Sequence, residues 1–141
     1  MGTLKKLEKS LFIETNKKIV EGWQKKYHDT LDVIGVRNAE LDTVLETIER
    51  VGIDKDPKED LIIKSAYIMG ATSWIQPFLS GNKRTGILVS ATFLHDNGFD
   101  IEITKKDESY LRETLYRIQD TRLELDSSII SELILYISKR I

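Results

Sequence analysis

The sequence predicts an all-α fold, a single compact domain over residues 1–141 with about six helices around two central ones. Two observations predict it. Apolar residues recur at helical spacing along most of the chain. Residues 61–75 and 87–94 are apolar on most of their helical faces, which is typical of helices buried in the middle of a domain. Of the 141 residues, 40% are hydrophobic and 31% are charged, which is sufficient for one stable core.

The first predicted helix covers about residues 4–26. Its apolar positions recur at roughly helical spacing: Leu4, Leu7, Leu11, Ile19 and Trp23. Residues 28–38 break this pattern, and their alternation of apolar and polar side chains predicts a short extended segment, a possible β flap. A second helix is predicted after Asn38, a good N-cap residue, and it ends near Gly52.

The third predicted helix has the clearest start in the sequence. Asp56 can cap it, Pro57 suits the first helical position, and Glu59 lies where a capping box has its acid. The helix must end before Pro77, because a proline disfavours the helical conformation of the residue that precedes it.

The fourth predicted helix begins at about Lys83 and ends at "DNG", where Gly98 can adopt a positive φ. The short segment "FDIEI" that follows is predicted to be extended. Two amphipathic helices complete the fold, over about residues 107–119 and 127–139.

The composition excludes several classes of function. The net charge is -2, from 21 basic and 23 acidic residues, so no overall positive field exists for general nucleic-acid binding. The chain has no cysteine and only 2 histidines, which argues against disulfides and against thiolate or histidine-rich metal sites. No window reaches the roughly 18 apolar residues of a membrane span, and the lysine-rich N-terminal segment does not resemble a signal peptide. We therefore expect no membrane partner and a cytoplasmic location.

The most informative stretch is "IQPFLSGNKRTG", residues 75–86, which joins the two central helices. Lys83 and Arg84 lie in the first turn of the second of them, where the helix dipole makes each cation unfavourable by roughly a few tenths of a kcal/mol. A bound anion explains them, because Gly81 lets backbone N–H groups turn toward a ligand and the dipole favours negative charge. Asn82 could cap the helix or hydrogen-bond the same anion, for which phosphate is the obvious candidate.

Spacing alone leaves a second interpretation open, in which the turn is solvated and its basic residues pair with acids elsewhere. A P-loop is excluded more firmly. That motif needs a glycine directly before its lysine and a strand before the loop. Here Asn82 precedes Lys83, and the preceding element is a predicted helix.

The segment "QPFLSGNKRT" also resembles the core motif of the Fic/Doc superfamily, His-x-Phe-x-Asp/Glu-Gly/Ala-Asn-Gly/Lys-Arg, which lies in a loop between two central helices. The lysine form, "NKRT", is typical of the Doc (death-on-curing) branch. The segments "GVRNAELDTVLETIE" and "FLHDNGFDI" resemble those that flank the motif in the family, so the resemblance covers about residues 12–140. Phe78 matches the phenylalanine that anchors the family's loop in the core.

The resemblance implies an all-helical Fic fold that binds ATP or another nucleotide at Gly81, Asn82, Lys83 and Arg84, with Arg84 also in the catalytic site. Most relatives transfer AMP to a hydroxyl side chain of a target protein. Doc-branch members are toxins of toxin–antitoxin pairs that phosphorylate a translation factor instead, and Lys83 is similar to that branch. The implied activity is therefore phosphoryl or AMP transfer to a protein target, with restraint by a separate antitoxin. A homo-oligomer is left open.

Two positions depart from the family pattern. Gln76 stands in place of the histidine that acts as general base, and an amide cannot accept a proton near neutral pH. Ser80 stands in place of the acid that holds Mg²⁺, an ion that proteins normally bind through carboxylates and phosphates. The sequence thus leaves open an active Doc-like transferase and a catalytically degenerate Fic-fold protein that binds a phosphate-bearing ligand or a protein partner. A third interpretation, an all-α interaction domain without a ligand, leaves the basic helix start unexplained.

No other residue is predicted to replace the missing groups. His95 lies about three helical turns from the loop and is interpreted as an ordinary surface histidine. Asp29 and Asp32 are conceivable acids, but nothing in the sequence brings them to the loop. Trp23 and Trp74 are interpreted as core residues, with a partner contact as the alternative for Trp23.

Overall fold

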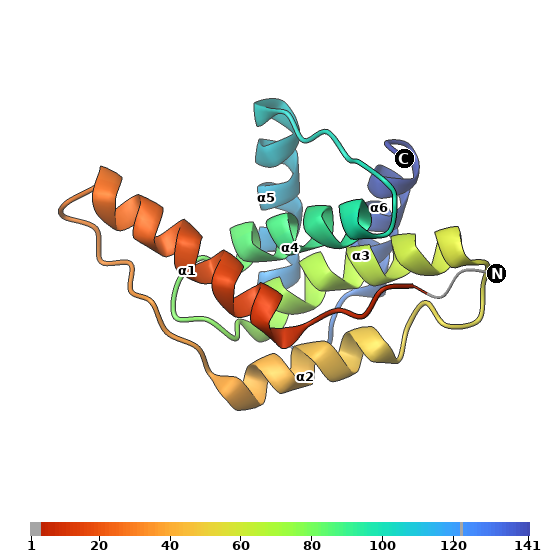
Figure 1. Ribbon diagram of the computed structural model, residues 1–141, viewed down its shortest axis with the longest axis horizontal. Coiled ribbons are helices and arrows are strands. Elements are labelled where there is room, and N and C mark those ends of the chain that lie inside the picture. The colour runs from red at the N-terminus through yellow and green to blue at the C-terminus, as the bar shows by residue number, and fades with distance from the viewer. Residues whose placement is uncertain (1–3, 122) are drawn as a thin grey trace.

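The structure is a computed structural model that describes residues 4–121 and 123–141. Within these residues it contains six helices and no β-sheet, which confirms the all-α prediction (Figure 1). The helices are α1 (Lys9–Lys26), α2 (Asn38–Glu49), α3 (Pro57–Ile75), α4 (Asn82–Asp96), α5 (Lys105–Asp120) and α6 (Ser127–Ser138). None of these described helices combines the length and the apolar character that crossing a membrane requires.

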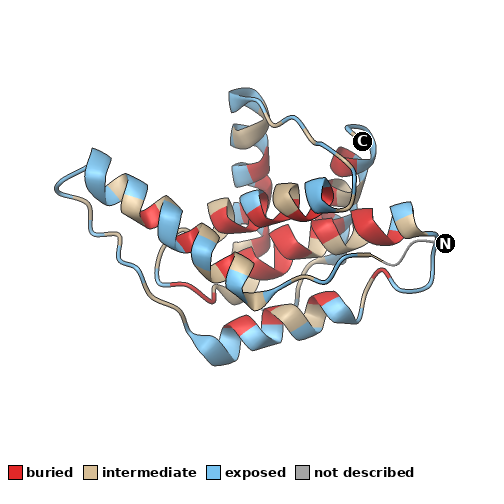
Figure 2. Ribbon diagram, viewed as in Figure 1, coloured by how far each residue is buried: buried red, intermediate tan, exposed pale blue. Residues whose placement is uncertain are grey.

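Helices α3 and α4 form the centre of the domain, as the sequence predicts. They lie side by side, with α2, α5 and α6 packed against α3, and α1 packed against α4 (Figure 1). Most of α3 is buried (Figure 2). Gly86 permits the close approach of the two helices, because a Cβ atom there would lie 3.2 Å from the Cα atom of Met69 and 3.3 Å from the carbonyl oxygen of Ile68.

The first helix is shorter than predicted. It begins at Lys9 rather than near residue 4, although Leu4 and Leu7 do pack against the core. The backbone before α1 finds a partner outside any helix, since Lys5 N donates a hydrogen bond to Asn97 Oδ1 at 2.8 Å. Apolar spacing in this segment therefore reflects burial of a non-helical chain.

The boundaries of α3 follow the predicted signals. The Asp56 side chain accepts a hydrogen bond from Glu59 N at 3.0 Å, and Pro57 is the first residue of the helix. The helix ends at Ile75, and Gln76 takes the left-handed conformation with φ 56° and ψ 63°. This reversal turns the chain into the loop that precedes α4.

The predicted flap is extended, but it forms no strand in the part of the chain that the structure describes. Val36 and Phe78 make one antiparallel bridge. Two backbone hydrogen bonds flank it: Leu79 N to Gly35 O at 3.1 Å and Arg37 N to Pro77 O at 2.7 Å. Because this pairing holds Arg37 extended, Arg37 is the N-cap of α2. The prediction that Asn38 caps this helix is therefore wrong by one position.

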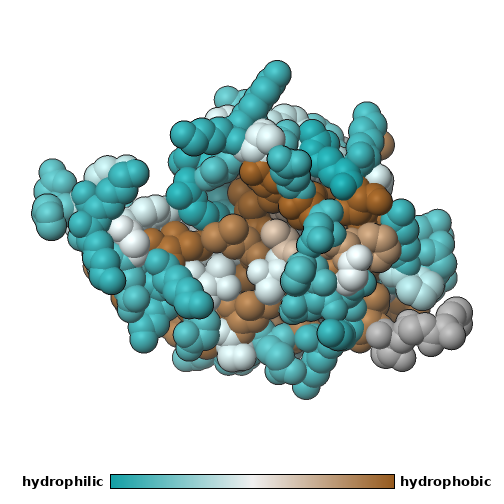
Figure 3. All heavy atoms as spheres, turned by 45° about the horizontal axis from the view of Figure 1, so that its top comes forward, coloured by the Kyte–Doolittle hydropathy of each residue, from teal (hydrophilic) through white to brown (hydrophobic). Residues whose placement is uncertain are grey.

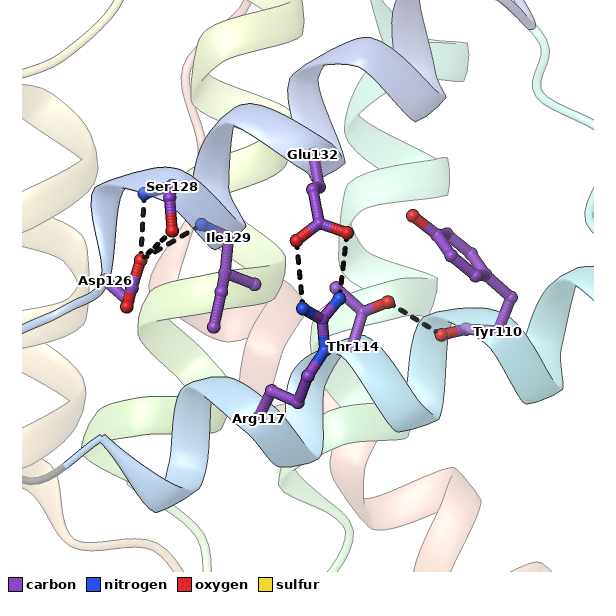
Figure 4. A network of polar contacts seen from close by, with 7 residues as sticks. All are labelled: Tyr110, Thr114, Arg117, Asp126, Ser128, Ile129 and Glu132. Atoms are coloured by element: carbon purple, nitrogen blue, oxygen red, sulfur yellow. Dashed lines mark hydrogen bonds and ion pairs between the residues drawn. The ribbon is translucent and has the colours of Figure 1, made fainter.

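A network of polar contacts fixes α5 against α6 (Figure 4). Arg117 of α5 donates to both carboxylate oxygens of Glu132 of α6, at 2.8 and 3.0 Å. Asp126 caps α6 by accepting hydrogen bonds from Ser128 N and Ile129 N. The position of α5 matters for function, because α5 forms one wall of the cavity described below.

The chain between α4 and α5 packs against the core from outside and forms no strand among its described residues. Gly98 follows the end of α4 with a φ of 92°, as the sequence predicts. The segment "FDIEI" is extended, and Ile101 and Ile103 in it pack against the core. Alternating burial therefore occurs here without a partner strand.

Polar and apolar residues are unevenly distributed over the visible surface. Figure 3 shows one face, on which hydrophobic residues concentrate toward the middle and hydrophilic residues toward the ends. Among the described residues, Leu31 and Leu123 have the most exposed large apolar side chains, at 94% and 97%. Both lie between helices, so the apolar stripes of the helices themselves are directed mainly into the core.

Candidate functional site

The start of α4 is the centre of the candidate site. Gly81 is its N-cap, with φ 78° in the left-handed region, and no side chain caps the helix. Side chains cap α3, α5 and α6, whereas α1 and α2, like α4, have no side-chain cap. The first turn of α4 therefore keeps backbone N–H groups that have no intrahelical partner, and its dipole favours a negative charge beside them.

Asn82 has a different role from the predicted cap. It is the first residue of α4. Its Oδ1 accepts a hydrogen bond from Phe78 N and its Nδ2 donates one to Phe78 O, both at 2.9 Å. The capping prediction is wrong because both polar atoms of the Asn82 amide are hydrogen-bonded to the backbone of Phe78. Asn82 nevertheless borders the cavity described below.

A buried asparagine ties the loop to α1. Asn16 is 2% exposed, and its Nδ2 donates hydrogen bonds to Ser80 O at 2.7 Å and to Thr85 Oγ1 at 3.1 Å. It also restricts Gly81, where a Cβ atom would lie 3.3 Å from Asn16 Nδ2. The loop and α1 are thus held in one arrangement by a satisfied buried polar group.

We expect Asn16→Ala to lower the free energy of unfolding by about 1–3 kcal/mol, because it leaves the Ser80 carbonyl and the Thr85 hydroxyl without their buried partner. Chemical denaturation followed by circular dichroism measures this change. Asn38→Ala is the control, since Asn38 is exposed at the start of α2 and its replacement should change stability by less than about 0.5 kcal/mol. Equal losses in the two variants would contradict this role of Asn16.

A cavity of about 440 Å³ lies at the start of α4. Its walls come from α1, the flap, the loop and α5. The described residues that line it are Trp23, Tyr27, Asp32, Gly81, Asn82, Lys83, Arg84, Arg112 and Tyr116. Basic and aromatic side chains dominate, which suits a ligand that carries both negative charge and a flat ring. The volume is that of a typical small-molecule site.

Lys83 is half-buried in the wall of this cavity. Its Nζ donates a hydrogen bond to Gln119 Oε1 and lies 4.2 Å from the centre of the Tyr116 ring. Burial lowers the pKa of Lys83, the nearby Arg112 guanidinium lowers this pKa further, and Asp120 acts in the opposite direction. An anion in the cavity would favour the charged form of Lys83, so the ammonium group is well placed to bind one.

Arg84 forms an ion pair with Glu108 of α5, in which Arg84 Nη2 lies 2.5 Å from Glu108 Oε1. The guanidinium also lies 5.5 Å from the centre of the Trp23 ring. Both members of the pair are about a third exposed, at 36% and 35%. Solvent therefore reaches the pair, and a phosphate could take the place of Glu108 on the guanidinium.

Helix α5 supplies site residues that sequence reasoning missed. Four of them contact the basic residues or line the cavity: Glu108, Arg112, Tyr116 and Gln119. They recur every three or four residues, which places them on one face of α5. This polar and aromatic stripe, beside the apolar stripe of the same helix, is the signal that could have found them.

The two tryptophans lie in different environments. The prediction that Trp23 belongs to the core is wrong, because Trp23 is only partly buried and lines the cavity. The end of α1 that carries Trp23 extends beyond the central helices (Figure 1). Trp74 does pack against the core, and its Nε1 donates a hydrogen bond to Thr121 O at 2.6 Å.

Gln76 and Ser80 both help to hold the loop. Gln76 is absent from the described residues that line the cavity, and its carbonyl accepts a hydrogen bond from Arg37 Nη1 at 2.9 Å. Ser80 Oγ accepts a hydrogen bond from Val33 N at 3.2 Å, which ties the flap to the loop. Neither side chain offers the cavity a base or a carboxylate.

Ser80, the predicted metal position, does not fit a Mg²⁺ ion. At Ser80, the predicted metal position, the structure has a neutral hydroxyl that already accepts a hydrogen bond. Nowhere among the described residues do three His, Asp or Glu side chains gather where they could hold a metal ion. Because Mg²⁺ is bound mainly through carboxylates and phosphates, we derive no step through a metal.

Of the other titratable residues considered from the sequence, Asp32 reaches the cavity. This was not expected, because its position depends on the folding of the flap. Asp29 is exposed and does not line the cavity. His95 is an exposed residue of α4, as predicted, and its Nδ1 lies 2.6 Å from Asp100 Oδ1. That hydrogen bond raises the pKa of His95.

Fold and site together define a class of protein: an all-helical domain whose two central helices are joined by a loop that ends in a basic, uncapped helix start. The model of the Fic/DOC family matches residues 4–94. The chain belongs to the Fic/DOC family. The match includes the loop and most of α4 but excludes α5 and α6, so it ends earlier than the resemblance expected over residues 12–140. Comparisons with curated proteins and with solved structures each gave no significant match.

Proposed function

We propose that this protein binds a nucleotide through its phosphates at the start of α4 and transfers a phosphoryl or AMP group to a hydroxyl of a target protein. The observation that carries the proposal is the cavity in which the uncapped first turn of α4, Lys83 and Arg84 meet Arg112 of α5. Backbone N–H groups, a helix dipole and three cations all favour phosphate there. Aromatic rings at Trp23, Tyr27 and Tyr116 offer faces for a nucleobase.

The residue chemistry indicates how the site would promote transfer. Catalysis of phosphoryl transfer consists mainly of positioning and of stabilising charge on the transferred group. Lys83 and Arg84 are held half-buried near the helix start, so their charges are fixed before the ligand arrives. Lys83 favours phosphoryl transfer over AMP transfer, by likeness to the Doc branch. A toxin role, with an antitoxin partner and a translation factor as target, belongs to the same proposal.

A second candidate function is nucleotide binding without transfer. The positions of Gln76 and Ser80 favour it, because neither places a base or a carboxylate in the cavity. In this case the protein would act as a binding or regulatory member of the family, and loss of proton transfer alone would cost about 10²–10⁴ in rate.

Calorimetry with ATP and transfer of label from γ-labelled and α-labelled ATP to proteins of a cell lysate test both functions. The first function predicts ATP binding and labelling from one of the two positions. Binding without labelling, with labelling restored in Gln76→His/Ser80→Asp, would establish the second. No affinity for ATP or inorganic phosphate would refute both and leave an interaction domain without a ligand.

We expect Glu108→Gln to increase ATP affinity several-fold. The substitution releases Arg84 from its ion pair and removes a negative charge beside the proposed phosphate site. A partly exposed ion pair is worth up to about 1 kcal/mol, which corresponds to about a fivefold change in the dissociation constant. Glu113→Gln removes the same charge from an exposed position of α5 and should have little effect. Weaker ATP binding by Glu108→Gln would show that Glu108 supports the ligand instead.

A further inference from the structure

The proposed transfer needs a group that accepts the proton of the target hydroxyl, and the motif itself does not provide one. The amide of Gln76 is not basic and the residue lies outside the cavity lining. Among the described residues that line the cavity, Asp32 is the one carboxylate. The flap therefore brings to the site the type of group that the loop has lost.

Asp32 is held in place by three hydrogen bonds. Thr30 Oγ1 donates to Asp32 Oδ2 at 2.8 Å, Asp32 N donates to Thr30 Oγ1 at 3.2 Å, and Gln24 Nε2 of α1 donates to Asp32 O at 3.1 Å. The other carboxylate oxygen, Oδ1, accepts no hydrogen bond from any described residue. One oxygen is thus fixed by Thr30 while the second is left for another donor, which is the arrangement that a positioned proton acceptor requires.

Ser80 contributes to the same arrangement. Its Oγ accepts a hydrogen bond from the backbone N–H of Val33, the residue directly after Asp32. Ser80 is also the residue directly before Gly81, the N-cap of α4. Ser80 therefore connects the flap, directly after Asp32, to the start of α4.

The charge of Asp32 also needs an explanation. A carboxylate beside bound phosphates is repelled by them, so it weakens nucleotide binding unless it interacts with a donor. Lys83, Arg84 and Arg112 line the same cavity, but none of them is hydrogen-bonded to Asp32. The hydroxyl group of a target protein is a suitable donor, because it must lose its proton. A carboxylate can accept that proton, as aspartate does in protein kinases.

We propose that Asp32 is the general base of the transfer reaction, an inference that rests on the proposed function. The hydroxyl oxygen of the target attacks the γ-phosphorus of ATP and forms a new P–O bond. The bond from this phosphorus to the bridging oxygen breaks, and ADP leaves with the electron pair. The hydroxyl proton passes to the Asp32 carboxylate, while Lys83 and Arg84 offset the negative charge on the phosphates.

The test compares Asp32→Asn, Asp32→Glu and Asp29→Asn with the unmodified protein. Each is assayed for ATP affinity by calorimetry and for transfer of label from γ-labelled ATP to proteins of a lysate of the source organism. Asp32→Asn should slow transfer by about 10²–10⁴ while ATP affinity is unchanged or higher. Asp32→Glu should recover part of the rate because it keeps the carboxylate. Asp29→Asn, an exposed neighbour that does not line the cavity, should match the unmodified protein in both measurements.

Several outcomes would overturn the inference without refuting nucleotide binding by the unmodified protein. One is an unmodified protein that binds ATP without transferring label, and another is an Asp32→Asn variant with its full rate. A third is a loss of rate in Asp32→Asn that is matched by an equal loss of ATP affinity, which would make Asp32 a binding residue. Absence of ATP binding in the unmodified protein refutes the proposed function itself, so the two failures can be distinguished.

Discussion

ATP should bind to Lys83→Ala/Arg84→Ala at least about 100-fold more weakly than to the unmodified protein. Each hydrogen bond to a charged group is worth about 1.5–3 kcal/mol, so loss of both side chains removes about 3–6 kcal/mol of binding free energy. At about 1.4 kcal/mol per tenfold change, this corresponds to a 10²–10⁴-fold increase in the dissociation constant. Calorimetry measures it directly. The backbone N–H groups of the first turn of α4 remain, so residual weak binding of phosphate is expected.

The control for this variant must remove the same charge elsewhere. Lys105→Ala/Lys106→Ala does so at two exposed positions of α5 that do not line the cavity. It should bind ATP within about threefold of the unmodified protein at physiological salt, because salt and solvent weaken the effect of exposed charges that do not contact the ligand. Similar losses in the two variants would mean that net charge, and not the site at α4, accounts for binding.

Phe78→Ala should lower the free energy of unfolding by about 3–5 kcal/mol, the range found for buried phenylalanines. Phe78 is 2% exposed and belongs to the core, although it lies in the loop that carries the site. Its backbone hydrogen bonds to Asn82 do not depend on the side chain, so the loss is one of packing. Domains are typically stable by about 5–15 kcal/mol, so this loss is a large share of the total stability.

Denaturant unfolding followed by circular dichroism tests this expectation, with Leu79→Ala as the control. Leu79 is the next residue in the chain but is 50% exposed, so its truncation should cost less than about 1 kcal/mol. If Phe78→Ala costs no more than Leu79→Ala, the loop is not anchored in the core as the structure indicates.

The elements that the sequence predicts best are those whose signals are local. Asp56, Pro57 and Pro77 act on residues near them in the chain, and they place both ends of α3 correctly. The start of α1 is predicted wrongly, because the spacing of Leu4 and Leu7 arises from packing of a non-helical segment against the core. Local spacing cannot separate these two causes of burial.

The same distinction applies to the site. Lys83 and Arg84 can be identified as site residues from the sequence, because cations are unfavourable at a helix start. This signal depends only on the local chain. Arg112 and Asp32 line the same cavity through the packing of α5 and the course of the flap. Their contribution depends on contacts between residues far apart in the chain. The stripe on α5 marks Arg112 as a candidate without showing that it meets the start of α4, and nothing local marks Asp32. The prediction that Trp23 belongs to the core is wrong for the same reason, since the helix that carries it extends past the core (Figure 2).

The left-handed conformation of Gln76 is held by contacts of its backbone and not by its side chain. Pro77 disfavours the helical alternative, the Gln76 N–H is bound to Thr72 O at 3.1 Å, and the Gln76 carbonyl is bound to Arg37. None of these constraints involves the Gln76 side chain. The turn can therefore persist while the residue at this position is exchanged during evolution. Replacement of Gln76 by histidine would therefore leave all of these backbone constraints in place.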